Sequence, residues 1–286
     1  MSDRLVWQKD SDVITHLKTL FKNEMAFSRA NGHFVIGLEL YAGCKRVSRA
    51  VRRLGFGMLG FEVLDGPQFD LLNPAVAQLV DSWIAGGCVG FVFLGTPCSS
   101  WYLVRRGPLG SSWGPIRSAR CIYGLPGLSP GDRAKVLLGN RTMRQSARTI
   151  RRCVECSVPA LLENPVSSRL LSAPPIRALT RLGCCERRVL DQCQYKCPWR
   201  KRTVILGWHA PGSLGKLNRM CTGRKGLCSA TGKHHIVLSG RNPATNELWT
   251  SQAQAYSPSF ANEIAKLLVQ SHSEMGLYAY GMRGRG

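Results

Sequence analysis

The stretch FVFLGTPCSSW, residues 91–101, decides how the rest of the chain is interpreted. Four apolar residues, 91–94, predict a buried strand, and Gly95 with Pro97 predicts a tight turn directly after it. The turn leaves the thiol of Cys98 at the rim of a sheet. In open α/β sheets this rim, at the carboxyl ends of the strands, is where ligands bind. A cysteine there can be a nucleophile, a metal ligand or a buried filler, and the remaining residues must decide among the three.

The surrounding pattern predicts an α/β fold. Apolar stretches of strand length alternate with stretches of helical period along the chain. The predicted strands are residues 35–41, 57–64, 91–94, 158–164 and 203–208, and the predicted helices are 12–21, 44–54, 76–84, 143–154 and 260–268. Continuous apolar strands are typical of parallel sheets covered on both faces, so we expect a parallel sheet between two layers of helices. Residues 105–132, rich in glycine, proline and serine, are expected to form a loop.

Basic residues dominate the chain and cluster in two segments. The 286 residues include 39 Lys and Arg against 17 Asp and Glu, a formal net charge of +22. Residues 116–152 hold nine basic side chains and a single acid, Asp132, whereas residues 216–241 hold six basic side chains and no acid. Basic stripes of this density indicate a polyanionic partner, most simply nucleic acid.

The sequence contains no sign of a membrane or secretory segment. No apolar run approaches the ~18 residues that a membrane-spanning helix needs. The first residues, MSDRLVWQKDSDV, lack the apolar core of a secretory signal. We therefore expect an intracellular protein without a membrane partner, located in the nucleus if the source is a eukaryote.

Cysteine and histidine residues in the last third of the chain have the character of a zinc set. The candidate ligands are Cys221, Cys228 and His234, with His235 adjacent and with Cys193 or Cys197 as a fourth. Thiolate and imidazole groups suit tetrahedral zinc, and zinc would help so small a segment to hold its shape. The alternative is a group of unpaired thiols and a solvated histidine pair in a basic loop.

A second predicted strand also ends in a reactive group. LLENP, residues 161–165, is an apolar strand that ends with Glu163 and a proline. If the two strands are neighbours, Cys98 and Glu163 face one cavity. This pair suits attack on an electron-poor ring: a cysteine adds to carbon 6 of a cytosine, and a carboxylic acid hydrogen-bonds ring nitrogen N3. Carbon 5 can then accept a methyl group.

Taken in order, the motifs resemble those of the cytosine carbon-5 DNA methyltransferases. GTPCSSW (95–101) resembles the Pro-Cys nucleophile loop of that family, and ENP (163–165) resembles its Glu-Asn-Val motif. YAGCKR (41–46) resembles the Phe-x-Gly-x-Gly cofactor motif, and YKCPWRKRTVILG (195–207) resembles the Tyr-Gly-x-Pro-Gln-x-Arg-x-Arg stretch. AYSPSFANEIAKLL (255–268) occupies the place of the last cofactor motif. The order of the motifs is more specific than any one of them.

The resemblance implies a Rossmann-like fold that uses S-adenosylmethionine, and it implies roles for individual residues. Cys98 would be the nucleophile and Glu163 the partner of cytosine N3. Arg200 and Arg202 match the pair that supports the cytosine and a nearby phosphate, and Asn164 would hold the Glu163 loop. The residues expected to line the S-adenosylmethionine site are Tyr41, Ala42, Gly43, Glu62 (ribose), Asp70 (adenine), Leu71, Gly95, Thr96, Pro97 and Asn262.

The same comparison divides the chain into four parts. We expect a catalytic core with an N-terminal helix at 1–207, a small basic target-recognition-like module at 208–250, a helix returning to the core at 251–272, and a disordered tail at 273–286. Because a cytosine must leave the base stack to reach the thiol, base flipping belongs to the expected mechanism. The module is short for reading sequence, so the basic segment 105–152 is expected to make much of the phosphate contact.

Departures from the family pattern leave alternatives open. Lys45 stands in place of the second motif glycine, Ser99 in place of the usual glutamine, and Trp199 near the glutamine that precedes Arg-x-Arg. They indicate a divergent branch of viral or retroelement type. One alternative is a catalytically inactive, methyltransferase-like nucleic-acid-binding protein, and another is the same chemistry on RNA. A cysteine hydrolase is least favoured, because it would need a histidine base near the end of a strand. Only two of the six histidines, His33 and His209, flank predicted strands.

Overall fold

A computed structural model of the chain describes residues 10–102, 114–210 and 213–283. The strands are β1 (Ile36–Leu40), β2 (Gly57–Phe61), β3 (Val89–Leu94), β4 (Ala160–Pro165), β5 (Cys185–Asp191) and β6 (Arg202–Trp208). The helices are α1 (Asp10–Ala30), α2 (Arg46–Arg52), α3 (Pro74–Ala85), α4 (Pro130–Glu155), α5 (Pro174–Leu179), α6 (Trp249–Gln252) and α7 (Pro258–Arg283). Short 3₁₀ helices are η1 (Val63–Asp65), η2 (Pro67–Phe69), η3 (Arg169–Ser172), η4 (Gln192–Tyr195) and η5 (Ser213–Lys216).

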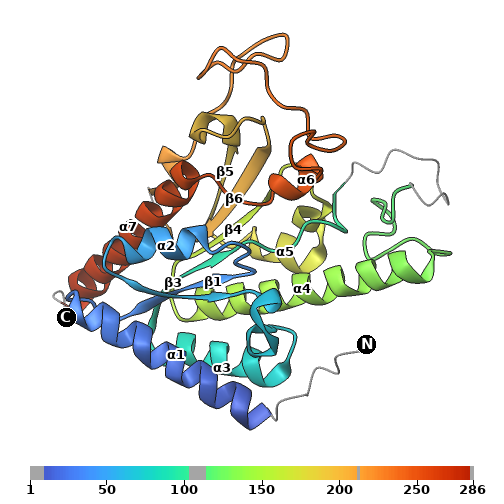
Figure 1. Cartoon of the computed structure of the whole chain (residues 1–286). Coiled ribbons are helices and arrows are strands. Elements are labelled where there is room, and N and C mark those ends of the chain that lie inside the picture. Colours follow the sequence, from blue (N-terminus) through green and yellow to red (C-terminus); the bar gives the residue numbers. More distant parts are fainter. Residues whose placement is uncertain (1–9, 103–113, 211–212, 284–286) are drawn as a thin grey trace.

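The strands form one mixed sheet in the order β2-β1-β3-β4-β6-β5 (Figure 1). β1 to β4 are parallel, as the sequence predicts, but β6 is antiparallel to both β4 and β5. The prediction of an all-parallel sheet is therefore wrong at this edge. The reason is that the connection between β5 and β6 holds only the short helix η4, and parallel neighbours need a longer crossover.

Helices cover both faces of the sheet, which makes the fold α/β and compatible with a Rossmann-like architecture (Figure 1). Alternate strand residues point to opposite faces. Leu38 and Leu162 lie in the core shared with α1, α3, α4 and α5, whereas Phe93 and Leu161 lie in the core shared with α2 and α7. Burial on both faces explains why the central strands are continuously apolar.

Strand β5 is absent from the sequence-based prediction. It is an edge strand and carries two arginines, of which Arg187 is exposed and Arg188 is half-buried. Charged residues are common on edge strands, where they discourage pairing with other chains, and they remove the apolar signal by which a strand is recognised.

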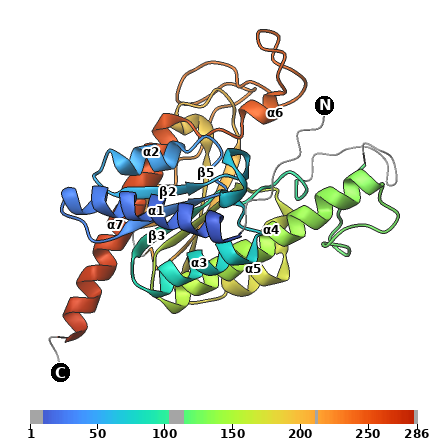
Figure 2. The same cartoon turned by 60° about the horizontal axis from the view of Figure 1, so that its bottom comes forward.

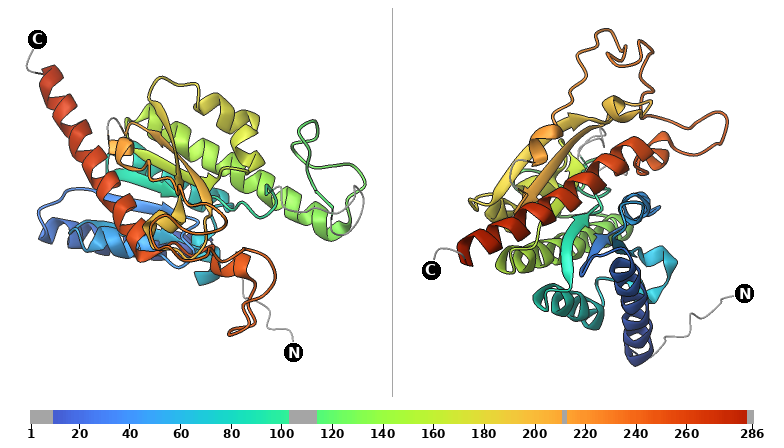
Figure 3. Two further views of the ribbon diagram at one scale, coloured as in Figure 1. Left: turned by 90° about the horizontal axis from the view of Figure 1, so that it is seen from above. Right: turned by 90° about the vertical axis from the view of Figure 1, so that its left-hand side faces the viewer.

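The last helix is longer than expected. Helix α7 continues without a break to Arg283, so the described part of the predicted tail, 273–283, is helical rather than disordered. No proline interrupts this stretch, and its Leu, Met, Glu and Ala residues favour a helix. Its last turns extend beyond the sheet (Figures 2 and 3). Residues 284–286 lie outside the described part of the chain.

One buried arginine fixes the segment 114–129 against the body of the protein. The guanidinium of Arg117 lies 3.5 Å from the centre of the Trp101 ring, and both side chains are buried. Its N–H groups donate to Ser100 O and Oγ, Asn140 Oδ1, Ile122 O and Val136 O. The turn after β3 and the first half of α4 are therefore held by the same side chain.

No described helix is apolar over enough of its length to cross a membrane.

A buried acid in the first strand generates a prediction about stability. Glu39 is 1% exposed, and its Oε2 accepts hydrogen bonds from Ser48 N and Oγ. Among the described residues, none donates to the other oxygen, Oε1. Burial raises the pKa of Glu39 to about 7, against the opposing effect of the Ser48 hydrogen bonds.

The folded protein therefore keeps the Glu39 proton up to about pH 7, whereas the unfolded chain releases it near pH 4.5. The stability that this creates is complete below about pH 4.5 and is lost as the pH rises to 7. We expect Glu39→Gln to gain stability relative to the wild type by about 3 kcal/mol over this range, and then to stay level. Urea unfolding at several pH values checks this. Parallel pH profiles for the two proteins would contradict it.

Candidate functional site

Cys98 and Glu163 lie at the carboxyl ends of two neighbouring parallel strands, β3 and β4. Leu94, the last residue of β3, pairs with Leu162 of β4, so Glu163 lies one residue beyond this pair. The turn that carries Cys98 is fixed to β4, because Asn164 Nδ2 donates to Thr96 O at 2.9 Å. Asn164 thus ties the turn that carries Cys98 to β4, a contact that differs from the expected one with the Glu163 loop.

Two side chains that were not predicted complete the surroundings of Glu163. Its Oε2 accepts a hydrogen bond from the Tyr256 hydroxyl at 3.0 Å, and its Oε1 lies 3.5 Å from Lys201 Nζ. Lys201 is close because β6 runs antiparallel to β4 and so begins at the carboxyl end of β4. Tyr256 arrives from the segment before α7. Lys201 stands between the two predicted arginines, and Tyr256 lies in the predicted last motif, but neither position alone indicates a contact with Glu163.

The thiol of Cys98 is half-buried and its ionisation depends on these neighbours. Burial raises the pKa of Cys98 above its ordinary value, the Lys201 ammonium lowers it, and the Glu163 carboxylate raises it. A cation and an anion thus act on the thiol together. The resting group is a thiol, and Lys201 is the side chain that favours its nucleophilic form.

The turn after β1 adjoins the end of β2. Gly43 N–H donates to Glu62 Oε2 at 2.8 Å, and Leu64 N–H donates to Glu62 Oε1 at 3.3 Å. Gly43 has a φ of +50°, and a Cβ built on it would meet no atom within 4 Å, so open space lies beside this turn. Leu64 is 89% exposed next to the Glu62 carboxylate. The region offers an acceptor, main-chain groups and an exposed apolar surface.

Gly95 lets two other parts of the chain pack closely against the turn after β3. A Cβ at this position would lie 3.1 Å from the Tyr256 hydroxyl oxygen and 3.1 Å from Tyr41 O, which is tighter than nearly all real contacts. Any residue with a Cβ would therefore require the turn after β1 or the segment before α7 to move. The turn after β3 therefore packs directly against both segments.

Other predicted cofactor residues have mainly structural contacts. Tyr41 donates its hydroxyl to Thr142 O at 3.2 Å, and Thr96 Oγ1 lies 2.8 Å from Ser146 Oγ, so both side chains turn toward α4. Asp70 Oδ1 accepts from Leu72 N at 2.8 Å. Ala42 and Leu71 are buried in the core, and Pro97 is exposed.

Asn262 does not join the strand ends. It is exposed on α7, and its Oδ1 accepts a hydrogen bond from Arg53, the residue that follows α2, at 3.3 Å. Lys45, at the start of α2, pairs with Asp65, and its ammonium lies 5.0 Å from the centre of the Phe69 ring. Lys45, which stands in place of the second glycine of the cofactor motif, is thus held beside the end of β2.

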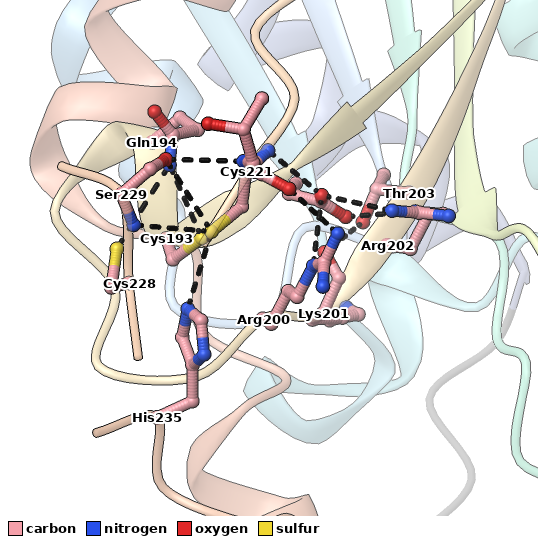
Figure 4. A network of polar contacts seen from close by, with 12 residues as sticks. Cys193, Gln194, Arg200, Lys201, Arg202, Thr203, Cys221, Cys228, Ser229 and His235 are labelled. Atoms are coloured by element: carbon pink, nitrogen blue, oxygen red, sulfur yellow. Dashed lines mark hydrogen bonds and ion pairs between the residues drawn. The ribbon is translucent and has the colours of Figure 1, made fainter. Parts of the chain in front are cut away.

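The two arginines that were expected to support the cytosine and a nearby phosphate both pair with a buried acid, Asp191. Arg200 Nε lies 3.1 Å from Asp191 Oδ2, and Arg202 Nε lies 2.9 Å from Asp191 Oδ1. Asp191, the last residue of β5, is fully buried, and its Oδ2 also accepts the Cys221 N–H at 3.0 Å. Burial raises the pKa of Asp191, but the hydrogen bonds from Arg202, Cys221 and Arg200 outweigh it and lower the pKa overall. We call Asp191, Arg200 and Arg202 the arginine hub (Figure 4).

Beside the arginine hub lies a group of four side chains that could bind a metal such as zinc. It comprises Cys193, Cys221, Cys228 and His235, whose ligand atoms all lie within 4.8 Å of one another. The fourth ligand is therefore His235 rather than the predicted His234, which is exposed and pairs through its backbone with Leu227. Neighbouring residues in a turn point in different directions, so the sequence alone could not choose between the two histidines. Cys197 lies elsewhere, with its thiol 3.7 Å from Gln192 Oε1.

Helix α4 presents a row of arginines to solvent. Arg141, Arg144, Arg148 and Arg151 are exposed and recur at helical spacing, so they share one side of the helix. Arg148 pairs with Asp81 at 2.7 Å. The first half of α4 extends away from the sheet (Figure 2). This row contains four of the nine basic side chains in the segment 116–152.

The chain matches no protein-family model. No curated protein is significantly similar to it in sequence. Its function is therefore inferred from the chemistry of the residues at the strand ends.

The neighbours of Cys98 generate a prediction about its reactivity. We expect Lys201→Met to slow alkylation of Cys98 near neutral pH and Glu163→Gln to accelerate it, because the first removes a cation and the second an anion. The change is about tenfold for each unit by which the pKa of Cys98 moves. Iodoacetamide labelling at several pH values, quantified for each cysteine by mass spectrometry, checks this. Exposed Cys44 is the internal standard. Equal Cys98 rates in all three proteins would show that the charges do not act on the thiol.

Proposed function

We propose that this protein is a DNA cytosine carbon-5 methyltransferase that uses S-adenosylmethionine and has a methyltransferase-type Rossmann-like fold. The observation that carries the proposal is the convergence of a half-buried thiol, Cys98, and a buried carboxyl group, Glu163, from the adjacent ends of β3 and β4. A nucleophile beside an acid is what addition to a cytosine ring requires. The order of the sequence motifs and the net charge of +22 agree with it.

Each side chain has a defined task in this reaction. The Cys98 thiolate forms a bond to carbon 6 of cytosine, and the electron pair of the 5,6 double bond moves toward carbon 5. Glu163, in its protonated form, donates a hydrogen bond to N3 and so stabilises the negative charge that develops on the ring. After carbon 5 has gained a methyl group, its hydrogen leaves as a proton to a base. The electron pair of that C–H bond restores the double bond and expels the thiolate of Cys98.

Lys201 and Tyr256 position Glu163 and tune the thiol. The Tyr256 hydroxyl and the Lys201 ammonium each contact one carboxyl oxygen, so rotation of the carboxyl group is restricted. A preorganised group loses little freedom when the substrate arrives, which favours the transition state. Lys201 also favours ionisation of Cys98.

S-adenosylmethionine, when bound, supplies an electrophilic methyl group. The residues that would hold it are the backbone of Gly43 and the carboxylates of Glu62 and Asp70. The open side of Gly43, where a Cβ would meet no atom within 4 Å, supports this fit. We do not include Asn262 in this group, because it lies beside Arg53 on the outer side of α7.

Nucleic acid is the proposed substrate because of charge and because the target is a base. The arginine row on α4 can contact phosphates, which contributes affinity without sequence information. A base inside a duplex cannot reach a thiol at a sheet edge, so it must be flipped out. The charge and the site suit RNA as well, and the experiment below therefore includes RNA.

A second candidate function is a catalytically inactive, methyltransferase-like nucleic-acid-binding protein. The observation in its favour is Lys45, which occupies the position of a motif glycine and is held by Asp65 beside the cofactor turn. Such a protein would bind nucleic acid without needing S-adenosylmethionine, so dependence on the cofactor separates the two candidates.

The proposal is tested with a mixed-sequence DNA duplex in which 5-fluorocytosine replaces cytosine. Fluorine cannot leave carbon 5 as a proton does, so the bond between Cys98 and carbon 6 persists. We expect an adduct that resists denaturation and requires S-adenosylmethionine. It should be absent from Cys98→Ser and present in Cys88→Ser, a matched control because Cys88 immediately precedes β3 at the opposite end of that strand.

The same gel distinguishes the alternatives. An adduct on a matched RNA but not on DNA would contradict the DNA assignment and identify RNA as substrate. An adduct that persists in Cys98→Ser would refute the role of this thiol. Absence of any adduct, from a folded protein that binds the pool, would favour the inactive nucleic-acid-binding candidate.

A further inference from the structure

The cysteine–histidine group beside the arginine hub has the composition and compactness of a zinc site. Cys193, Cys221 and Cys228 are 1%, 3% and 5% exposed, and His235 is half-buried. In a tetrahedral site with Zn–S distances of about 2.3 Å, the ligand atoms lie about 3.8 Å apart. Here Cys221 Sγ lies 3.7 Å from His235 Nε2, and all four ligand atoms lie within 4.8 Å of one another. A small contraction therefore produces tetrahedral coordination.

The surroundings of the sulfur atoms also suit thiolates. Ser229 donates to Cys221 Sγ from its backbone N–H at 3.4 Å and from its hydroxyl at 3.6 Å. Gln194 Nε2 donates to Cys193 Sγ at 3.6 Å and lies 3.9 Å from Cys228 Sγ. Hydrogen-bond donors around the ligands are typical of metal sites, where they orient the ligands and stabilise their charge.

The segment around these ligands has little else to hold it in one conformation. In the described part of residues 209–248, regular structure consists of η5 and of two isolated bridges, Leu227 with His234 and Arg241 with Leu248. The three cysteines form a small buried cluster of their own, separate from the two main cores. A segment without an apolar core generally needs a metal or disulfides to fold, and the cysteines are free thiols.

Cys221 connects this cluster to the arginine hub through both of its peptide groups. Its N–H donates to Asp191 Oδ2 at 3.0 Å, and its carbonyl accepts from Arg200 Nη2 at 2.7 Å. Asp191 N–H in turn donates to Arg219 O at 3.0 Å. Figure 4 shows the sulfur atoms and His235 on one side of Cys221 and the arginine side chains on the other. Lys201, which contacts Glu163, lies between the two arginines in the chain.

We propose that Cys193, Cys221, Cys228 and His235 bind one zinc ion, and that this ion fixes the Arg200–Arg202 segment, and with it the contact between Lys201 and Glu163. The metal site does not depend on the proposed methyltransferase activity. The coupling concerns the same active site, and it is therefore measured by metal content and thiol reactivity rather than by methyl transfer.

The metal content of the full chain tests the first part. We expect about one zinc per chain in the wild type, measured by mass spectrometry of the elements. His235→Ala should lose it, whereas His234→Ala, a change at the adjacent exposed histidine, should retain it. His235→Cys should also retain zinc, because four thiolates form an equally good tetrahedral site. This rescue separates loss of a ligand from a defect in folding.

Cobalt provides a measurement that does not depend on any variant. The wild type, stripped of metal by a chelator and loaded with Co²⁺, should show the intense visible absorption of tetrahedral thiolate coordination. A wild type that contains no zinc and gives no tetrahedral cobalt spectrum would overturn the proposal. So would a His235→Ala variant that keeps full zinc content.

The coupling is tested by the rate at which Cys98 is alkylated. Removal of zinc should slow the labelling of Cys98 to the rate of Lys201→Met, because Lys201 is released from its place beside Glu163. The same change is expected in His235→Ala and not in His234→Ala. Unchanged labelling of Cys98 after complete loss of zinc would overturn the coupling, whatever the result of any methylation assay.

Discussion

The candidate site at the ends of β3 and β4 depends on one buried carboxyl group. Glu163 is 5% exposed in the middle of the sheet, and a buried carboxylate is tolerated only when it is paired or hydrogen-bonded. Lys201 and Tyr256 supply these contacts from segments that are far apart in the sequence. Meeting this requirement brings the start of β6 and the segment before α7 to the end of β4. It also places a cation where it acts on Cys98.

The same physical requirement organises the neighbouring part of the molecule. Asp191 is fully buried at the end of β5, and two guanidinium groups and the Cys221 N–H satisfy it. Because β4 and β5 both lie antiparallel to β6, their carboxyl ends meet at one edge of the sheet. The two buried acids therefore lie on opposite sides of β6, where Glu163 pairs with Ile205 and Asp191 pairs with Arg202. The metal-binding group is attached to this edge and not to the main core.

Local patterns were sufficient for much of this account. Apolar runs and helical periods predict five of the six strands, four of which are parallel as expected, and strand adjacency brings Cys98 to Glu163. Long-range pairing was not predictable, because an acid such as Asp191 gives no local sign of the arginines that will neutralise it. The antiparallel direction of β6 follows from its short connection to β5. The sequence did not reveal this connection, because β5 carries charged residues and was not recognised as a strand. The choice of His235 over His234 depends on the turn geometry around Gly226, where φ is +82°.

We propose that the residues at the ends of β3 and β4 transfer a methyl group to carbon 5 of cytosine. The most direct measurement incubates the full chain with cytosine-containing DNA and S-adenosylmethionine carrying an isotopically labelled methyl group. The DNA is then digested to nucleosides for mass spectrometry. The account predicts labelled 5-methyldeoxycytidine from the wild type and none from Cys98→Ser. Label on another base or at another atom of cytosine, or an equal yield from Cys98→Ser, would contradict it.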